Sequence, residues 1–192
     1  MNYLAHALLS EPHAFSVIGN VAGDLVKGRL EHHSLHPRVA DGVRRHRRVD
    51  MLTDTHPHYR EMVASFGGPQ RRVAPIVLDV LFDHYLFRNW GRFSTFGRDA
   101  FIDDVYRVLS TPGAPLPPAL AERAPMWVGA NWLRAYNSMA GVEAVLARLA
   151  TRARRELPVI ETLAAAQHLD STLEAGFLKV FADVQSRVDG LS

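Results

Sequence analysis

The chain has 192 residues, of which 47% are hydrophobic and 22% charged, a balance typical of a folded globular protein that excludes a largely disordered one. It contains no cysteine, which excludes disulfides, thiolate metal ligands and a cysteine nucleophile. The net charge is +2, and arginine supplies nearly all the positive charge, because Lys27 and Lys179 are the only lysines. The length predicts one domain over residues 1–192.

The N-terminal stretch, MNYLAHALLSEPHAFS, has no basic region and no long apolar run. We therefore expect neither a signal peptide nor a membrane span, and a cytoplasmic location. Helical patterns separated by turn residues follow along the whole chain, without the alternation typical of strands, so the sequence predicts an all-α fold. The first two helices are expected at residues 2–9 and 14–30, and a loop at 31–37.

Proline suits the first turn of a helix, so the next two helices are expected to begin at Pro37 and Pro57. Residues 71–90, RRVAPIVLDVLFDHYLFRNW, are apolar on nearly every side, which predicts a central buried helix. Ser94 is expected to cap a helix that runs to about Leu109. After a proline-rich loop at 110–120, residues 126–188 predict three or more amphipathic helices.

A buried-looking helix face carries polar groups in the segment HRRVDMLTD. His46, Asp50 and Asp54 are four residues apart and share that face, which continues backwards through Val39 and Val43. Burying an imidazole and a carboxylate is costly unless something satisfies them, and a metal ion is one solution. Asp54 we expect instead to cap the following helix.

A second pair with the same spacing, Asp79 and Asp83, is followed by His84 in the central apolar helix. Asp24 in GNVAGDLVKG and His6 in NYLAH complete the candidates. Sulfur-free, carboxylate-rich ligation suits Mn²⁺ or Mg²⁺, and Fe²⁺ or Zn²⁺ is also compatible.

Each candidate also has a structural interpretation. His6 could be a hydrogen-bonded core histidine, Asp24 could belong to a polar network with Asn20, and Asp50 could pair with Arg47 or Arg48. The metal interpretation leads to chemistry, because a bound metal lowers the pKa of water and, with nearby arginines, neutralises an attacked phosphoryl group. The sequence contains no P-loop, Rossmann fingerprint, serine elbow or HExxH motif, so hydrolysis of a phosphoester is favoured.

The arginines are clustered, and their planar forks suit phosphate or carboxylate groups. Such clusters predict an acidic partner, either protein or nucleic acid, although a solvated surface is the simpler alternative. The three clusters are Arg44, Arg45, Arg47 and Arg48; Arg71 and Arg72; and Arg148, Arg152, Arg154 and Arg155.

Four motifs occur in the order MNYLAH, GNVAGDLVKG, HRRVDMLTDTHP and RRVAPIVLDVLFDHYLFRNW. In order and spacing they closely resemble the acyl carrier protein phosphodiesterases, most strongly over the N-terminal half of the chain. The resemblance implies a fold like that of the HD-type phosphohydrolases and a preference for Mn²⁺. It also implies hydrolysis of the 4′-phosphopantetheine arm from a serine of holo-acyl carrier protein, which yields the apo-protein and free 4′-phosphopantetheine.

Motif matching carries the metal centre over to six positions: Asp24, His46, Asp50, Asp79, Asp83 and His84. The pair Asp83-His84 stands in reversed order relative to the wider HD pattern. We expect Asp24 to be catalytic, and His6 or His84 to supply the proton that the leaving serine needs. The acidic carrier protein would dock on Arg44, Arg45, Arg47 and Arg48 first, and on Arg71 and Arg72 next.

Two other functions fit the same residues. One keeps the metal centre but acts on nucleotides or another small phosphoester. The other is a basic helical module that binds nucleic acid, with His46 and Asp50 purely structural. The sequence shows no recognition helix and no platform of interleaved aromatic residues, so we expect neither nucleic acid nor a membrane as the partner.

Overall fold

The structure, a computed structural model, describes residues 1–151 and 157–190. Every regular element in these ranges is a helix, which confirms the all-α prediction. None of the described helices combines the length and the apolar character needed to cross a bilayer. The chain forms two compact units: the α2 unit, residues 3–50 and 90–134, and the α5 unit, residues 1–2, 51–89 and 135–192.

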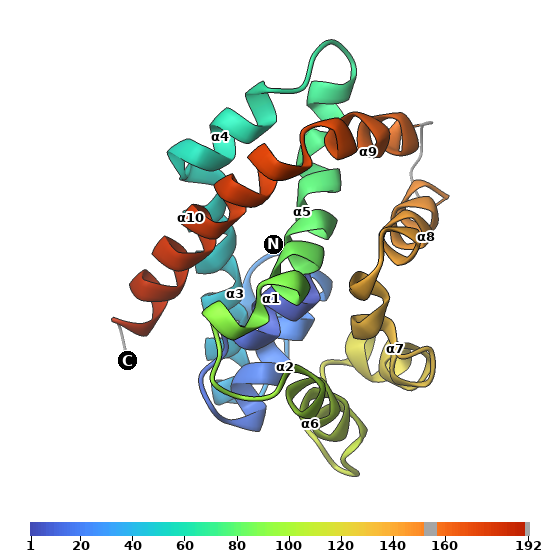
Figure 1. Cartoon of the computed structure of the whole chain (residues 1–192). Coiled ribbons are helices and arrows are strands. Elements are labelled where there is room, and N and C mark those ends of the chain that lie inside the picture. The colour runs from blue at the N-terminus through green and yellow to red at the C-terminus, as the bar shows by residue number, and fades with distance from the viewer. Residues whose placement is uncertain (152–156, 191–192) are drawn as a thin grey trace. The chain divides into compact units, whose positions relative to one another are not determined.

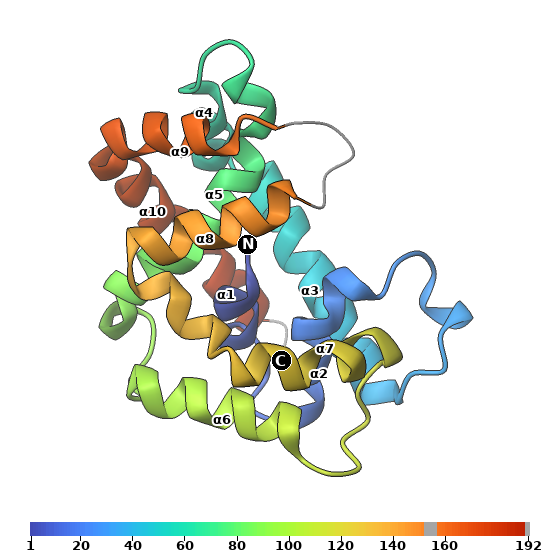
Figure 2. The ribbon, with the colours of Figure 1, turned by 90° about the vertical axis from the view of Figure 1, so that its right-hand side faces the viewer.

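The α2 unit is built around a short helix, α2 (Ala14–Ala22), which packs against α1 and α6 (Figure 2). Ile18, Val21 and Ala22 bury the apolar face of α2. The other helices of the unit are α1 (Tyr3–Leu8), α6 (Arg98–Ser110), α7 (Pro118–Gly129) and most of α3 (Pro37–Thr55). Three short 3₁₀ turns join them: η1 (Gly23–Leu25), η2 (Leu30–His32) and η3 (Trp90–Arg92).

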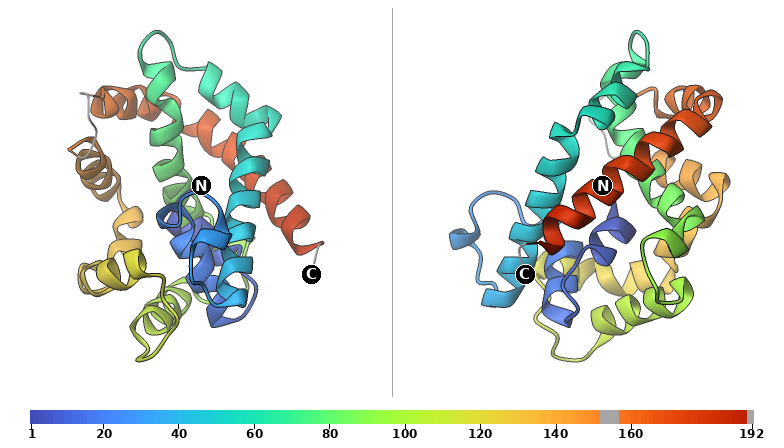
Figure 3. Two further views of the ribbon diagram at one scale, coloured as in Figure 1. Left: turned by 180° about the vertical axis from the view of Figure 1, so that it is seen from behind. Right: turned by 60° about the vertical axis from the view of Figure 1, so that its left-hand side comes forward.

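Helix α2 (blue) lies beside the first part of α3 (lighter blue) in the left view of Figure 3. Two glycines allow this close contact. A β-carbon at Gly42 would lie 2.8 Å from the carbonyl oxygen of Ser16, and one at Gly19 would overlap the carbonyl of Val39. Because side chains at these positions would force the backbones apart, the glycines set the helix separation that places α3 beside α2.

The α5 unit surrounds α5 (Gln70–Arg88), the apolar helix predicted at residues 71–90. Its buried residues lie on all sides and include Val77, Leu81, Phe82 and Leu86. It packs against four helices (Figure 1): α4 (Pro57–Ala64), α8 (Met139–Ala150), α9 (Val159–His168) and α10 (Asp170–Asp189). The prediction of a central buried helix is confirmed. A last 3₁₀ turn, η4, covers Trp132–Asn137.

The helix predicted at residues 14–30 is shorter than expected. It ends at Ala22 and continues as η1, and η2 occupies part of the predicted loop at 31–37. Between these turns the carbonyls of Val26 and Gly28 accept hydrogen bonds from Arg47 instead of from helical N–H groups. Gly28 has a φ of 78°, which ends helical geometry at that point.

Two predicted helix caps are wrong, and one helix begins early. Asp54 lies within α3, and the cap of α4 is His56, whose Nδ1 accepts from the N–H of His58. Ser94 does not cap α6, which begins at Arg98, but instead accepts from the N–H of Phe96 within the preceding loop. Short-range bonds of this kind compete with helix caps. Helix α7 begins at Pro118, inside the predicted proline-rich loop, because proline fits its first turn.

Candidate metal centre

His46 lies on the buried face of α3, in line with Val39 and Val43 as the spacing predicts, and its side chain is 4% exposed. Its Nδ1–H donates to the carbonyl oxygen of Asn20, near the end of α2, at 2.9 Å. That bond fixes the ring, and Nε2 faces the carboxylate of Asp50. The backbone of Gly23 lies directly against the imidazole of His46, because a β-carbon at this position would overlap the ring.

Asp50 lies one turn further along α3 and contacts two histidines. Its Oδ2 is 3.1 Å from Nε2 of His46, and its Oδ1 is 3.0 Å from Nε2 of His6 on α1. The two imidazole rings are stacked, with their centroids 3.8 Å apart. Both histidines are buried, whereas the carboxylate is partly exposed, so the cluster opens to the surface of the α2 unit on the side of Asp50.

Two members of the cluster, His6 and Asp50, have the protonation expected of metal ligands. Burial, followed by repulsion from His46, lowers the pKa of His6 to about 4, so the ring is neutral at pH 7. Burial alone would raise the pKa of Asp50, but the hydrogen bonds from His46 and His6 outweigh it and lower the pKa below its ordinary range. A carboxylate held ionised against buried imidazoles is a donor set for a divalent cation.

The orientation of the two imidazole rings is also compatible with a bound cation. Because Nδ1 of His46 is bonded to the carbonyl of Asn20, Nε2 is the ring nitrogen that faces Asp50 and can serve as a ligand to a cation there. One ligand atom each from His6, His46 and Asp50 lies within 4.8 Å of the other two. Metal–ligand bonds of about 2.0–2.2 Å span such a group with small side-chain movements.

Asp24 belongs to the rim of this cluster. It lies in η1, with its Oδ2 4.0 Å from Nε2 of His46 and its Oδ1 3.2 Å from Nζ of Lys27. Its side chain is 56% exposed, in contrast to the apolar helix position expected from the sequence. Asn20, the partner of Asp24 in the structural alternative, accepts a hydrogen bond from His46 through its carbonyl.

The remaining candidates lie in the α5 unit, and their role as ligands stays a prediction. Asp83 is fully buried, and His84 is buried with its Nδ1–H donating to the carbonyl of Tyr136 at 2.8 Å. Asp79 is partly exposed, and its Oδ1 lies 2.7 Å from the amino group of Met1. Among the described residues, these three do not form a metal-sized group by themselves.

The arginines of α3 fall into two kinds. Arg45 donates through Nε to the carbonyl of Leu9 at 2.5 Å, and Arg47 donates to the carbonyls of Val26 and Gly28 at 2.9 and 2.7 Å. These two guanidinium groups join α3 to earlier segments of the chain. The sequence did not reveal this role, because the acceptors are 19 to 36 residues away.

The other arginines point to the surface. Arg44 pairs with Asp41 at 2.6 Å, and both Arg44 and Arg48 are exposed on α3. Arg71 and Arg72 are exposed in the first turn of α5. In the third cluster Arg148 donates to the carbonyl of Ala144. Arg152, Arg154 and Arg155 lie outside the described residues.

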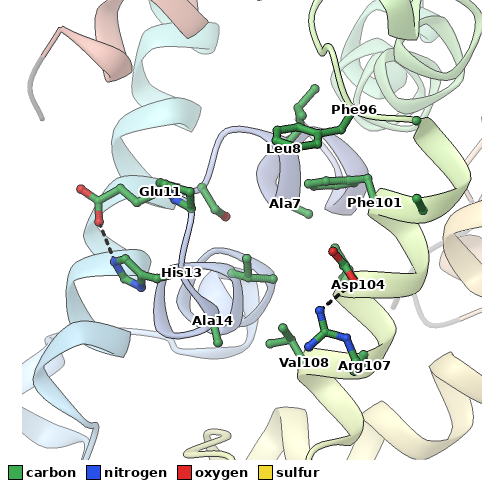
Figure 4. A pocket seen from close by; sticks show the side chains of 16 residues that line it. Ala7, Leu8, Glu11, His13, Ala14, Phe96, Phe101, Asp104, Arg107 and Val108 are labelled. Atoms are coloured by element: carbon green, nitrogen blue, oxygen red, sulfur yellow. Dashed lines mark hydrogen bonds and ion pairs between the residues drawn. The ribbon is translucent and has the colours of Figure 1, made fainter.

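An apolar pocket of about 490 Å³ also lies in the α2 unit, between the end of α1, α2 and α6 (Figure 4). Leu8, Phe96 and Phe101 contribute to its lining, and the ion pairs His13–Glu11 and Arg107–Asp104 belong to it as well. None of the candidate metal ligands lines this pocket. The lining of this pocket is therefore distinct from the His6, His46 and Asp50 cluster.

Comparison with known proteins agrees with the geometry. The family model described as acyl carrier protein phosphodiesterase matches residues 1–184. Proteins named acyl carrier protein phosphodiesterase from Salmonella newport, Salmonella heidelberg and Salmonella enteritidis are each 36% identical over 156 residues, which cover 81% of this chain and 80% of theirs. No solved structure matches the chain. The chain belongs to the acyl carrier protein phosphodiesterase family.

Proposed function

We propose that the protein is a metal-dependent phosphodiesterase that hydrolyses the 4′-phosphopantetheine arm from the serine of holo-acyl carrier protein, which yields apo-acyl carrier protein and free 4′-phosphopantetheine. Family membership supports the substrate and the reaction. The observation that supports the chemistry is the Asp50 carboxylate, which lies within 3.1 Å of two buried imidazole nitrogens.

In this proposal His6, His46 and Asp50 hold the metal, and Asp24 joins them from the rim. A bound Mn²⁺ would lower the pKa of water and neutralise phosphoryl charge; Mg²⁺ or Fe²⁺ suits the same ligands. Asp24 is half exposed and can accept the proton of the attacking water. His6 fits the role of ligand better than that of proton donor, because its lowered pKa leaves the ring neutral at pH 7.

The surface of α3 supports an acidic protein as the substrate. Arg44 and Arg48 are exposed on the helix that carries His46 and Asp50. Exposed positive charges steer an acidic partner during encounter, and salt weakens that effect. We propose that these two arginines, and not Arg45 or Arg47, take part in docking the carrier protein.

The test is to incubate the metal-stripped protein with holo-acyl carrier protein, with and without Mn²⁺, and to follow the mass of the carrier. Manganese-dependent loss of the arm, with free 4′-phosphopantetheine appearing, is the expected result. An unchanged carrier mass, in the presence of folded and metal-loaded protein, would overturn the proposal. Hydrolysis of nucleotides or other small phosphoesters by the same sample would then assign the metal centre to that second class of substrate.

A further inference from the structure

The segment between η1 and η2 has no regular secondary structure, yet side chains hold three of its carbonyls in a row. Arg47 donates to the oxygens of Val26 and Gly28, at 2.9 and 2.7 Å, and His33 donates through Nε2 to the oxygen of Lys27 at 2.8 Å. An exposed segment normally leaves such groups to water. Here they fix the backbone on both sides of Lys27.

Lys27 extends from this fixed segment towards the candidate metal centre. Its Nζ lies 3.2 Å from Oδ1 of Asp24, and the other oxygen of that carboxylate lies 4.0 Å from Nε2 of His46. The side chain of Lys27 is 77% exposed. It is the only lysine in the described chain outside α10, where Lys179 lies.

The Lys27–Asp24 pair is exposed, and a surface ion pair contributes little stability, so this pair leaves the ammonium group available to another anion. An ammonium group is a compact charge on a flexible stem, and it binds a phosphate oxygen as readily as a carboxylate oxygen. A phosphodiester that reaches the cluster from the open side meets Lys27 at the rim.

We propose that Lys27 binds the phosphodiester group of the substrate, and that Arg47 is the positioning residue that holds the Lys27 segment in place. The inference rests on the proposed function and names the group that recognises the phosphate. Asp24 holds the ammonium at the rim before substrate arrives. Arg47 acts through the carbonyls of Val26 and Gly28 and does not touch the substrate.

The experiment compares Lys27→Ala and Lys27→Arg with the unchanged protein, and uses Lys179→Ala as the matched control. Two quantities are measured with Mn²⁺ present: the KM for holo-acyl carrier protein, and the dissociation constant for free 4′-phosphopantetheine by calorimetry. The calorimetric measurement of the dissociation constant requires neither turnover nor carrier protein. The melting temperature with and without Mn²⁺ shows whether each variant still binds metal.

We expect Lys27→Ala to raise both constants by about tenfold or more, the effect of one lost charge-assisted hydrogen bond, while the Mn²⁺-induced shift in melting temperature is retained. Lys27→Arg should keep most of the affinity, and Lys179→Ala should match the unchanged protein. Unaltered values of both constants in Lys27→Ala would overturn the role of Lys27.

Arg47→Gln tests the positioning role. We expect it to raise the dissociation constant for 4′-phosphopantetheine in the same direction as Lys27→Ala, and to have little additional effect in the double variant, because both changes remove the same contact. Fully additive effects would show that Arg47 acts independently of Lys27. Absence of hydrolysis by the unchanged protein would instead contradict the proposed function, whereas the binding measurement would still decide the role of Lys27.

Discussion

The imidazole rings of His6 and His46 are stacked 3.8 Å apart, and the Nε2 atoms of both face one carboxylate, that of Asp50. The two histidines are 40 positions apart, on α1 and α3. Burial first, and then the charge interaction with His46, lower the pKa of His6 to about 4. The relationship leads directly to predictions on metal binding and on pH.

Replacing Asp50 by Ala should abolish metal binding. A cation that binds only the folded state raises the melting temperature, and at a Mn²⁺ concentration 100 times the dissociation constant the gain is about 2.7 kcal/mol. Differential scanning calorimetry of the metal-stripped protein, with and without Mn²⁺, measures this shift. Asp41→Ala is the matched control, because Asp41 is an exposed aspartate of the same helix whose described partner is Arg44. A Mn²⁺ shift that persists in Asp50→Ala would remove Asp50 from the centre.

Stability of the metal-free protein should fall as the pH decreases from about 6.5 to about 4. In this window the unfolded chain protonates His6 at its ordinary pKa, while the folded protein resists until its lowered pKa is reached. The difference corresponds to a loss of at most about 3 kcal/mol of unfolding free energy. Urea unfolding across this range, in the presence of a chelator, measures the slope. His6→Gln should flatten the curve, and an identical slope in that variant would show that other groups cause it.

Gly42→Val should destabilise the protein strongly, by more than about 2 kcal/mol, because its side chain would meet the backbone of α2 at Ser16 and Gly19. The control is Gly91→Ala, where an added β-carbon meets no atom within 4 Å. Thermal unfolding of both variants measures the difference. Similar melting temperatures for the two variants would mean that α2 and α3 can separate without loss of packing.

Arg48→Glu should raise the KM for holo-acyl carrier protein several-fold at low salt and leave kcat almost unchanged, because an exposed charge mainly affects encounter. The difference from the unchanged protein should shrink as the ionic strength rises. Kinetic assays at two salt concentrations measure both effects. Arg72→Glu, on α5, shows whether the second predicted cluster contributes in the same way. Equal KM values at low salt for Arg48→Glu and the unchanged protein would exclude Arg48 from docking.

Much of the fold could be predicted from local pattern. Apolar periodicity and proline placement predicted the starts of α3 and α4 and the buried helix α5. The four-residue spacing of His46 and Asp50 predicted their shared face, since that spacing is a property of one helix. The predicted caps failed for different reasons: Ser94 accepts from an N–H within its own loop, whereas α3 extends through Asp54 and His56 caps α4 instead.

Contacts between distant segments could not be predicted in the same way. Nothing in the residue pattern shows that His46 bonds to the carbonyl of Asn20, because any residue offers a carbonyl. The same holds for Arg47, whose acceptors at Val26 and Gly28 are backbone atoms. From the sequence, Arg47 is a candidate for binding an anionic partner. Only the fold shows that its guanidinium group instead bonds to backbone carbonyls of the same chain.

The early end of α2 has an electrostatic consequence. The last carbonyls of a helix carry the negative pole of its dipole, equivalent to about half an elementary charge. Asn20 is within one turn of this end, and its carbonyl attracts the Nδ1 proton of His46, which increases the electron density at Nε2. Had the helix continued to Leu30, this carbonyl would lie in the helix interior, away from the pole. The break at Ala22 thus makes Nε2 of His46 a better ligand atom for a cation.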